Sequence, residues 1–166
     1  MNALNVSQLD AGCFQKYGVF SDFVHVDSFS IGSPPCEFFR DLAVLDLGSH
    51  TSASFSICRI GNRPTVIDCL EYHNCTGEGM MPLDGDVYLC FAPASLANEI
   101  PLENVEVFFV PRHTMITIRP GVWHCAAYTV GSDSVDVLII LPERTYTNDC
   151  VVVPLIDGNQ IEFANT

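Results

Sequence analysis

Short runs of β-branched and aromatic residues recur along almost the whole chain, and turn residues separate them. The runs span residues 19–26, 42–47, 54–60, 65–72, 87–91, 105–110, 114–119, 124–130, 135–141 and 150–155. Glycine, proline, asparagine and aspartate gather between them, as at residues 32–35, 61–64, 83–85, 119–121 and 131–133. About ten strands at this spacing are typical of a sandwich or barrel. We therefore expect an all-β fold, and specifically a jelly-roll barrel, because closed architectures leave no sheet edge exposed.

One short helix is expected before the strands begin, over residues 7–17. Ser7 is its predicted cap, Leu9 and Phe14 lie on its apolar side, and Gly18 ends it. The remaining intervals are too short for a second core, and 48% of the 166 residues are hydrophobic, which is ample for one. We expect a single domain over residues 1–166.

The charge balance excludes several classes of partner. Seven Lys and Arg residues stand against 20 Asp and Glu residues, for a formal net charge of -13. Neutralising a phosphate backbone needs many cations, so we expect no nucleic-acid partner. An acidic chain is repelled by anionic membrane surfaces, and its apolar runs fall far short of the ~20 residues of a membrane span. We expect no membrane partner and a small molecule as ligand.

The start of the chain and its cysteines favour the cytoplasm. Residues 1–14 contain neither a basic start nor an apolar run of signal-peptide length. None of the eight cysteines forms a Cys-x-x-Cys pair, and most lie in apolar runs. We expect reduced, buried thiols that pack as small hydrophobic residues.

Acidic and imidazole side chains cluster at two places that sheet pairing can bring together. Glu71 and His73 are two residues apart in an extended run, so they project to the same face. Glu78 follows a glycine-bearing turn, and His124 lies on a later strand. Carboxylate and imidazole together suit a borderline divalent ion, with positions left open for substrate. Either imidazole alone has a simpler interpretation as a hydrogen-bonded core residue.

This spacing resembles the two motifs of the cupin superfamily. Its first motif is His-x-His, three or four residues, Glu, six residues and Gly, and its second ends in Gly-x-x-His. The matching residues are His73, Glu78, Gly85, Gly121 and His124, with Glu71 at the position of the first histidine. The resemblance implies a cupin-type jelly-roll barrel.

A narrower resemblance covers nearly the whole chain and is to the ureidoglycolate lyase family of cupins. Its landmarks are Phe14-Gln-Lys-Tyr17-Gly18, Arg40-Asp41-Leu42-Ala43, Ser56-Ile-Cys-Arg59, Glu71-Tyr-His73, Pro82-Leu-Asp-Gly85-Asp86, Gly121-Val-Trp-His124 and Asn148-Asp149-Cys150. The resemblance implies cleavage of ureidoglycolate into glyoxylate and urea, a step of allantoin degradation. In that reaction a base takes the carbinol proton and an acid protonates the departing nitrogen.

The resemblance also implies roles for particular side chains. Glu71, His73 and His124 are the expected catalytic residues, and with Glu78 they form the expected metal set for Ni, Mn, Zn or Fe, if a metal is bound at all. Independently of the resemblance, Arg119 and Arg59 are candidates to bind substrate because cations are scarce in this chain, and Tyr128 is a third candidate because alternation puts it on the same face as His124. Each arginine could hold a substrate carboxylate with two hydrogen bonds, or could form an ordinary structural ion pair.

Two other functions fit the same residues. A metal-dependent cupin isomerase, epimerase or dioxygenase would use the four residues as a full ligand set, and a non-catalytic cupin would bind a small molecule without converting it. We also expect a homodimer, because an apolar strand such as residues 105–110 would be hazardous at an uncovered edge.

Overall fold

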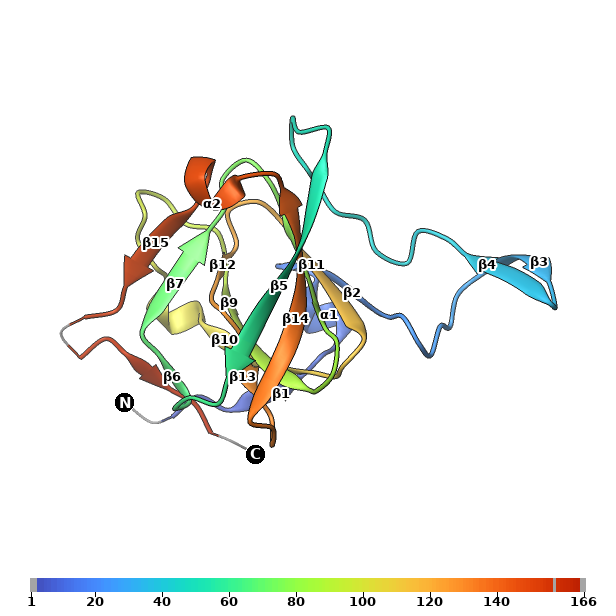
Figure 1. Ribbon diagram of the computed structural model, residues 1–166. Helices are drawn as coiled ribbons and strands as arrows, with labels where there is room; N and C mark the ends of the chain where they lie inside the picture. The colour runs from blue at the N-terminus through green and yellow to red at the C-terminus, as the bar shows by residue number, and fades with distance from the viewer. Residues whose placement is uncertain (1–2, 157, 165–166) are drawn as a thin grey trace.

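The strands of the computed structural model, which describes residues 3–156 and 158–164, form two main sheets (Figure 1). The five-stranded sheet contains, in spatial order, β2 (Gly18–Asp22), β11 (Thr114–Ile118), β8 (Glu78–Pro82), β14 (Ser134–Pro142) and β5 (Ala53–Gly61). The seven-stranded sheet contains β1 (Val6–Gln8), β10 (Glu106–Val110), β9 (Val87–Ala92), β12 (Trp123–His124), β7 (Cys69–Tyr72) and β15 (Val151–Pro154), with β13 (Tyr128–Thr129) also on β9. Most neighbouring strands are antiparallel, and β1 runs parallel to β10.

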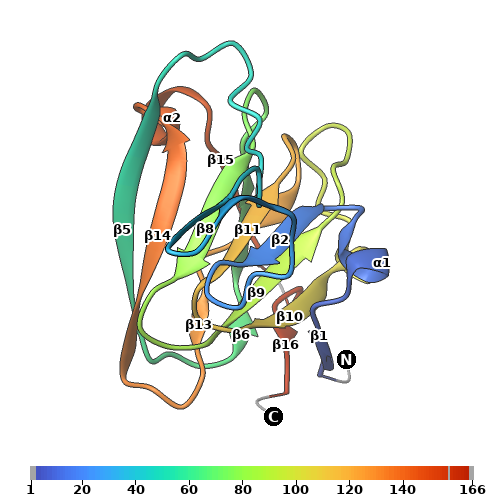
Figure 2. The same cartoon turned by 90° about the vertical axis from the view of Figure 1, so that its right-hand side faces the viewer.

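The main core lies between these two sheets. Alternation along β9 shows how it forms, because Val87, Leu89 and Phe91 join one buried apolar cluster while Tyr88 and Cys90 join another. The first cluster draws side chains from both sheets. Figure 2 shows β5 and β14 side by side at the margin of the molecule opposite α1 (Ala11–Phe14). Two sheets that enclose one core confirm the predicted all-β, jelly-roll fold.

The N-terminal helix is shorter than predicted. It covers only Ala11–Phe14, and the predicted cap Ser7 is wrong because this residue lies in β1. Asp10 caps the helix instead, its side chain accepting hydrogen bonds from the backbone N–H groups of Gly12 and Cys13. Residues 7 and 8, predicted as the first turn of the helix, instead belong to a strand, because residues 6–8 pair with β10.

Several strand predictions also need correction. Residues 42–47 form no strand, and residues 124–130 divide into the short strands β12 and β13. Strand β8 was not predicted, because its Glu-Gly-Met-Met-Pro sequence has little β propensity, yet it pairs with a strand on each side. Strand β10 is paired on both sides, by β1 and β9, so its edge needs no second copy to cover it.

Several short elements lie outside the two main sheets. Strands β6 (Val66–Ile67) and β16 (Ile161–Glu162) pair with each other, and Leu102–Asn104 form a 3-10 turn. Helix α2 (Thr145–Asn148) lies between β14 and β15. No helix in the described part of the chain is long and apolar enough to cross a membrane.

A hairpin projects away from the body of the molecule (Figure 1). It consists of β3 (Ser30–Ser33) and β4 (Cys36–Phe39), which pair only with each other, and we call it the arm. The sequence analysis read its glycine and prolines as a turn but missed the flanking strands. The arm exposes the large apolar side chains of Ile31 and Phe38, and Phe29, directly before β3, is exposed as well.

Candidate active site

The two sequence motifs meet at one end of the space between the sheets. Glu71 lies on β7 and pairs across the strands with His124 on β12. His73 follows β7 directly, and Glu78 begins β8 in the other sheet. Gly121 joins the motifs, because its N–H donates to the carbonyl of His73 and its φ of +80° is one that glycine adopts readily.

Two imidazole nitrogens converge on one carboxylate oxygen of Glu78. Glu78 Oε2 lies 3.0 Å from His73 Nε2 and 2.9 Å from His124 Nε2. All three residues are buried. Glu71 Oε1 is 3.8 Å from His124 Nε2, and the Glu71 side chain is 25% exposed, so it alone among the four is in partial contact with solvent.

Backbone carbonyls fix the orientation of both imidazoles. His73 Nδ1 lies 2.7 Å from the carbonyl of Asp149, and His124 Nδ1 lies 2.9 Å from that of Val122. A carbonyl only accepts, so each Nδ1 carries the hydrogen and donates it. Each Nε2 therefore faces Glu78 either with a lone pair, ready for a cation, or with a second proton.

The carboxylate and the imidazole stabilise each other's charge. Burial disfavours the charged form of Glu78, but the close positive charge of His124 and the hydrogen bond with His73 outweigh it and lower the pKa of Glu78 to about 2. Burial likewise opposes protonation of His124, yet Glu78, with a smaller contribution from Glu71, raises the pKa of His124 to about 9. Without a bound cation, His124 is therefore protonated at neutral pH.

The raised pKa of His124 predicts a loss of stability in mild alkali. A histidine has an ordinary pKa of about 6.5, so its stabilising protonation is complete below pH 6.5 and is lost as pH rises through about 9. We expect the free energy of unfolding of EDTA-treated protein, measured with urea, to fall between pH 6.5 and pH 9. A His124→Gln variant should show a flatter profile. Equal slopes for the two proteins would contradict the raised pKa.

The same groups have the chemistry of a divalent metal site. The donor atoms of His73, Glu78 and His124 all lie within 4.8 Å of one another, and among the described residues only these form such a group. His124 Nε2 is buried without a well-aligned hydrogen-bond partner, which is the state of an atom whose natural partner is a cation. Two nitrogens and a carboxylate suit Zn, Ni, Mn or Fe. These three residues fit a metal, whereas Glu71 lies outside the group.

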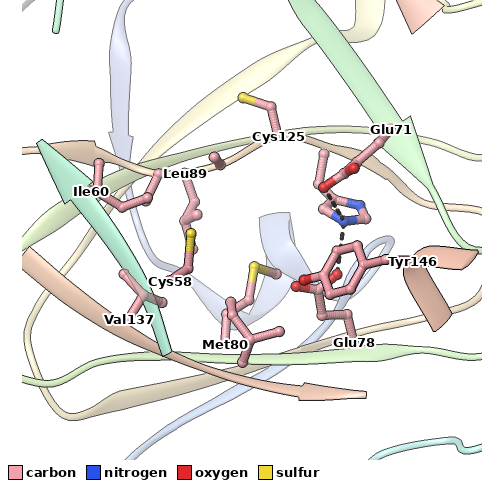
Figure 3. Close-up of a pocket in the computed structure, with 13 residues that line it drawn as sticks. Cys58, Ile60, Glu71, Glu78, Met80, Leu89, Cys125, Val137 and Tyr146 are labelled. Carbon is pink, nitrogen blue, oxygen red and sulfur yellow. Dashed lines mark ion pairs between the residues drawn. The ribbon is translucent and has the colours of Figure 1, made fainter. Parts of the chain in front are cut away.

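A small cavity opens beside these groups (Figure 3). Its volume is about 50 Å³, room for a small molecule rather than a nucleotide or polymer. Glu71, Glu78 and Tyr146 lie on one side of it, and an apolar and sulfur-bearing wall faces them. That wall contains Cys58, Ile60, Met80, Leu89 and Val137.

The predicted substrate-binding residues do not reach this cavity. Arg59 is exposed on β5 and forms a double hydrogen bond with Asp136 at 2.7 Å, which is the structural ion pair rather than the carboxylate clamp. Arg119 is exposed and donates to the carbonyl of Gln15. Tyr128 was predicted to share a face with His124, but its hydroxyl donates to the carbonyl of Val66 within the second apolar cluster.

Three residues near the site were not recognised as functional from the sequence. Asp149 holds the turn after His73, since its carboxylate accepts from the N–H groups of Asn74 and Cys75 at 2.8 and 2.7 Å. Cys150 donates to Glu71 Oε2 at 3.2 Å, and Tyr146 lies over the cavity on α2. The Asn148-Asp149-Cys150 landmark contained this signal, but nothing in its spacing assigned a role.

The chain is similar in sequence to proteins of one known family. The family described as ureidoglycolate lyase matches residues 1–162. The chain belongs to the ureidoglycolate lyase family. It is 26% identical to the ureidoglycolate lyase of Rhodobacter capsulatus over 134 residues, which is 80% of this chain and 82% of that protein. The ureidoglycolate lyase of Escherichia coli is 26% identical over 124 residues, covering 73% of this chain and 76% of that protein.

Among solved structures, the chain is similar to oxalate decarboxylase of Bacillus subtilis. The identity is 14% and the TM-score is 0.43 over 62% of this chain, for a structure described by its Mn(II) centers. The chain spans about a quarter of that enzyme, since 24% of it is covered. A likeness of this extent adds nothing to the functional assignment, which depends on the family and on the site.

Of the eight cysteines, none forms a disulfide. The prediction that they are buried holds for Cys90 and Cys125 only. Cys13, Cys36 and Cys75 are exposed.

Proposed function

We propose that this chain is a ureidoglycolate lyase that cleaves the C–N bond of ureidoglycolate and releases glyoxylate and urea. Family membership over residues 1–162 supports the reaction. The observation that supports this reaction in this chain is that Glu71, Glu78 and His124 converge on one small cavity. This arrangement places proton acceptors and a proton donor around a single small substrate.

The reaction is an elimination at one carbon. Ureidoglycolate carries its hydroxyl and its ureido nitrogen on the same carbon, next to the carboxylate. A base removes the hydroxyl proton, the C–O bond gains double-bond character, and the C–N bond breaks with its electron pair going to nitrogen. An acid then protonates that nitrogen to complete urea. One proton leaves the hydroxyl and one reaches the nitrogen, so the reaction balances.

We assign the two proton transfers to different residues. Glu71 is the partly exposed carboxylate of the cavity, and it takes the hydroxyl proton. His124 is protonated at neutral pH because its pKa is raised to about 9, and it donates to the departing nitrogen. Glu78 holds that proton on His124 Nε2, while His73 holds Glu78 from the other side at 3.0 Å. His73 and Glu78 are therefore positioning residues.

The positive charge that binds the substrate carboxylate comes from the same cluster of side chains. No arginine or lysine is among the described residues that line the cavity, so the imidazolium of His124 is the cation nearest to it. When a divalent ion is bound, His73, Glu78 and His124 would hold it, and it would supply a positive charge that polarises substrate oxygens. His124 Nε2 would then be a ligand rather than an acid, so Glu71 would accept the hydroxyl proton and return it to the departing nitrogen.

Direct assay tests the proposed function. We expect EDTA-treated protein, alone or with added Ni, Mn, Zn or Fe, to convert ureidoglycolate to glyoxylate in at least one of these conditions. Replacing His124 by glutamine should lower kcat by about 10²–10⁴-fold, the usual contribution of one acid–base group. Glyoxylate release is the measurement. Absence of turnover in every condition would contradict the proposal.

A metal-dependent isomerase, epimerase or dioxygenase is the second candidate. The buried, convergent donors of His73, Glu78 and His124 favour it. Elemental analysis separates the two: about one redox-active ion per chain together with no glyoxylate release would favour the second candidate. Turnover of ureidoglycolate by metal-free protein would favour the lyase.

A further inference from the structure

Two buried cysteines meet behind the wall of the cavity, on strands that pair. Cys90 lies on β9, and Cys125 directly follows β12. His124 pairs with Phe91, so the next residue in each direction brings Cys125 opposite Cys90. The two Sγ atoms are 2.7 Å apart, and Cys90 and Cys125 are 0% and 5% exposed respectively.

The pair lies in apolar surroundings, apart from the candidate metal group. Both cysteines belong to the second apolar cluster with Trp123 and Tyr128. Neither belongs to the metal-type group of the described residues. Cys125 is one of the residues that line the cavity, and Figure 3 shows its sulfur turned away from the cavity centre, while Cys90 is not among the lining residues.

We propose that Cys90 and Cys125 form a reversible disulfide that joins β9 to β12. Both S–H bonds break and one S–S bond forms, with the loss of two protons and two electrons. A low-molecular-weight disulfide such as oxidised glutathione accepts both and leaves as two thiols. A disulfide between intracellular cysteines is usually a redox-sensing one. Strand β12 is only Trp123–His124, so the link restrains the backbone next to His124.

Peptide mapping of the full chain tests this bond independently of any activity. The chain is incubated with oxidised glutathione, both folded and during refolding from urea, so that burial does not keep the oxidant out. Free thiols are then alkylated under denaturing conditions. We expect one linked peptide pair containing Cys90 and Cys125, a melting temperature raised by several degrees, and reversal of both by dithiothreitol.

Matched variants make the outcome decisive. Cys90→Ser should abolish both the linked peptide and the rise in melting temperature. Cys58→Ser, which removes a different thiol at the cavity, should leave both unchanged. Alkylation of Cys90 and Cys125 in the oxidised sample, after refolding as well, would overturn the proposal, and so would linkage of either one to a different cysteine.

Discussion

Replacing Glu78 by glutamine is expected to lower the turnover of ureidoglycolate by about 10²–10⁴-fold. The change keeps the shape of the side chain but removes the charge that raises the pKa of His124 to about 9. Burial of His124 then dominates, its proton is lost at neutral pH, and the acid is missing from the reaction. Affinity for a divalent ion should fall by at least the 10–100-fold found for groups that merely support metal ligands.

The same variant should remain folded, which separates catalysis from stability. Breaking a buried ion pair usually costs about 3–5 kcal/mol because one charge is left uncompensated. Here His124 can release its proton, so the cost in free energy of unfolding should stay below that range. Activity, metal content and urea unfolding are measured on the variant and on an exposed control, Glu37→Gln. Unchanged activity and metal content in Glu78→Gln would remove Glu78 from the site.

Replacing Phe14 by alanine is expected to lower the free energy of unfolding by about 3–5 kcal/mol. Phe14 ends a helix of only four residues, yet it is fully buried. Its ring packs edge-on against the rings of Tyr17, Phe20, Phe91 and Phe108 at centroid distances of 5.4–5.8 Å. The loss therefore combines a cavity with four aromatic contacts.

Urea unfolding measures this effect, with Leu96→Ala as the exposed control. We expect the control to change stability by less than about 0.5 kcal/mol. A loss below about 1 kcal/mol for Phe14→Ala would mean that the N-terminal helix packs on the sheets only loosely.

The sequence predicted the strands that alternate and missed those fixed by their partners. Residues 135–141 alternate in burial and form β14 as expected. Strand β8 contains glycine, methionine and proline, and it exists because β11 and β14 supply hydrogen bonds on both sides. Residues 42–47 have the composition of a strand but no partner strand in the described structure. Local propensity carries no information about such pairing.

The candidate site was predictable where spacing alone determines geometry. Glu71 and His73 lie two residues apart on an extended segment, and His124 comes from a motif with its own glycine, so all three were placed correctly near Glu78. Arg59 and Arg119 were expected in the cavity because cations are scarce in this chain. The scarcity of cations does not indicate which way a side chain points. Arg59 instead pairs with Asp136 across β5 and β14.

Glu78 belongs to the five-stranded sheet, whereas His124 and Glu71 belong to the seven-stranded one. Whatever joins these side chains, whether a proton, a metal ion or a substrate, therefore links the two halves of the fold at one end. Occupancy of the cluster should couple their opening, so that amide hydrogens of β8 and of β12 exchange with solvent at a common rate when the cluster is filled. When the cluster is empty, the two sheets can open separately, and the amide hydrogens of β8 and β12 should then exchange at different rates.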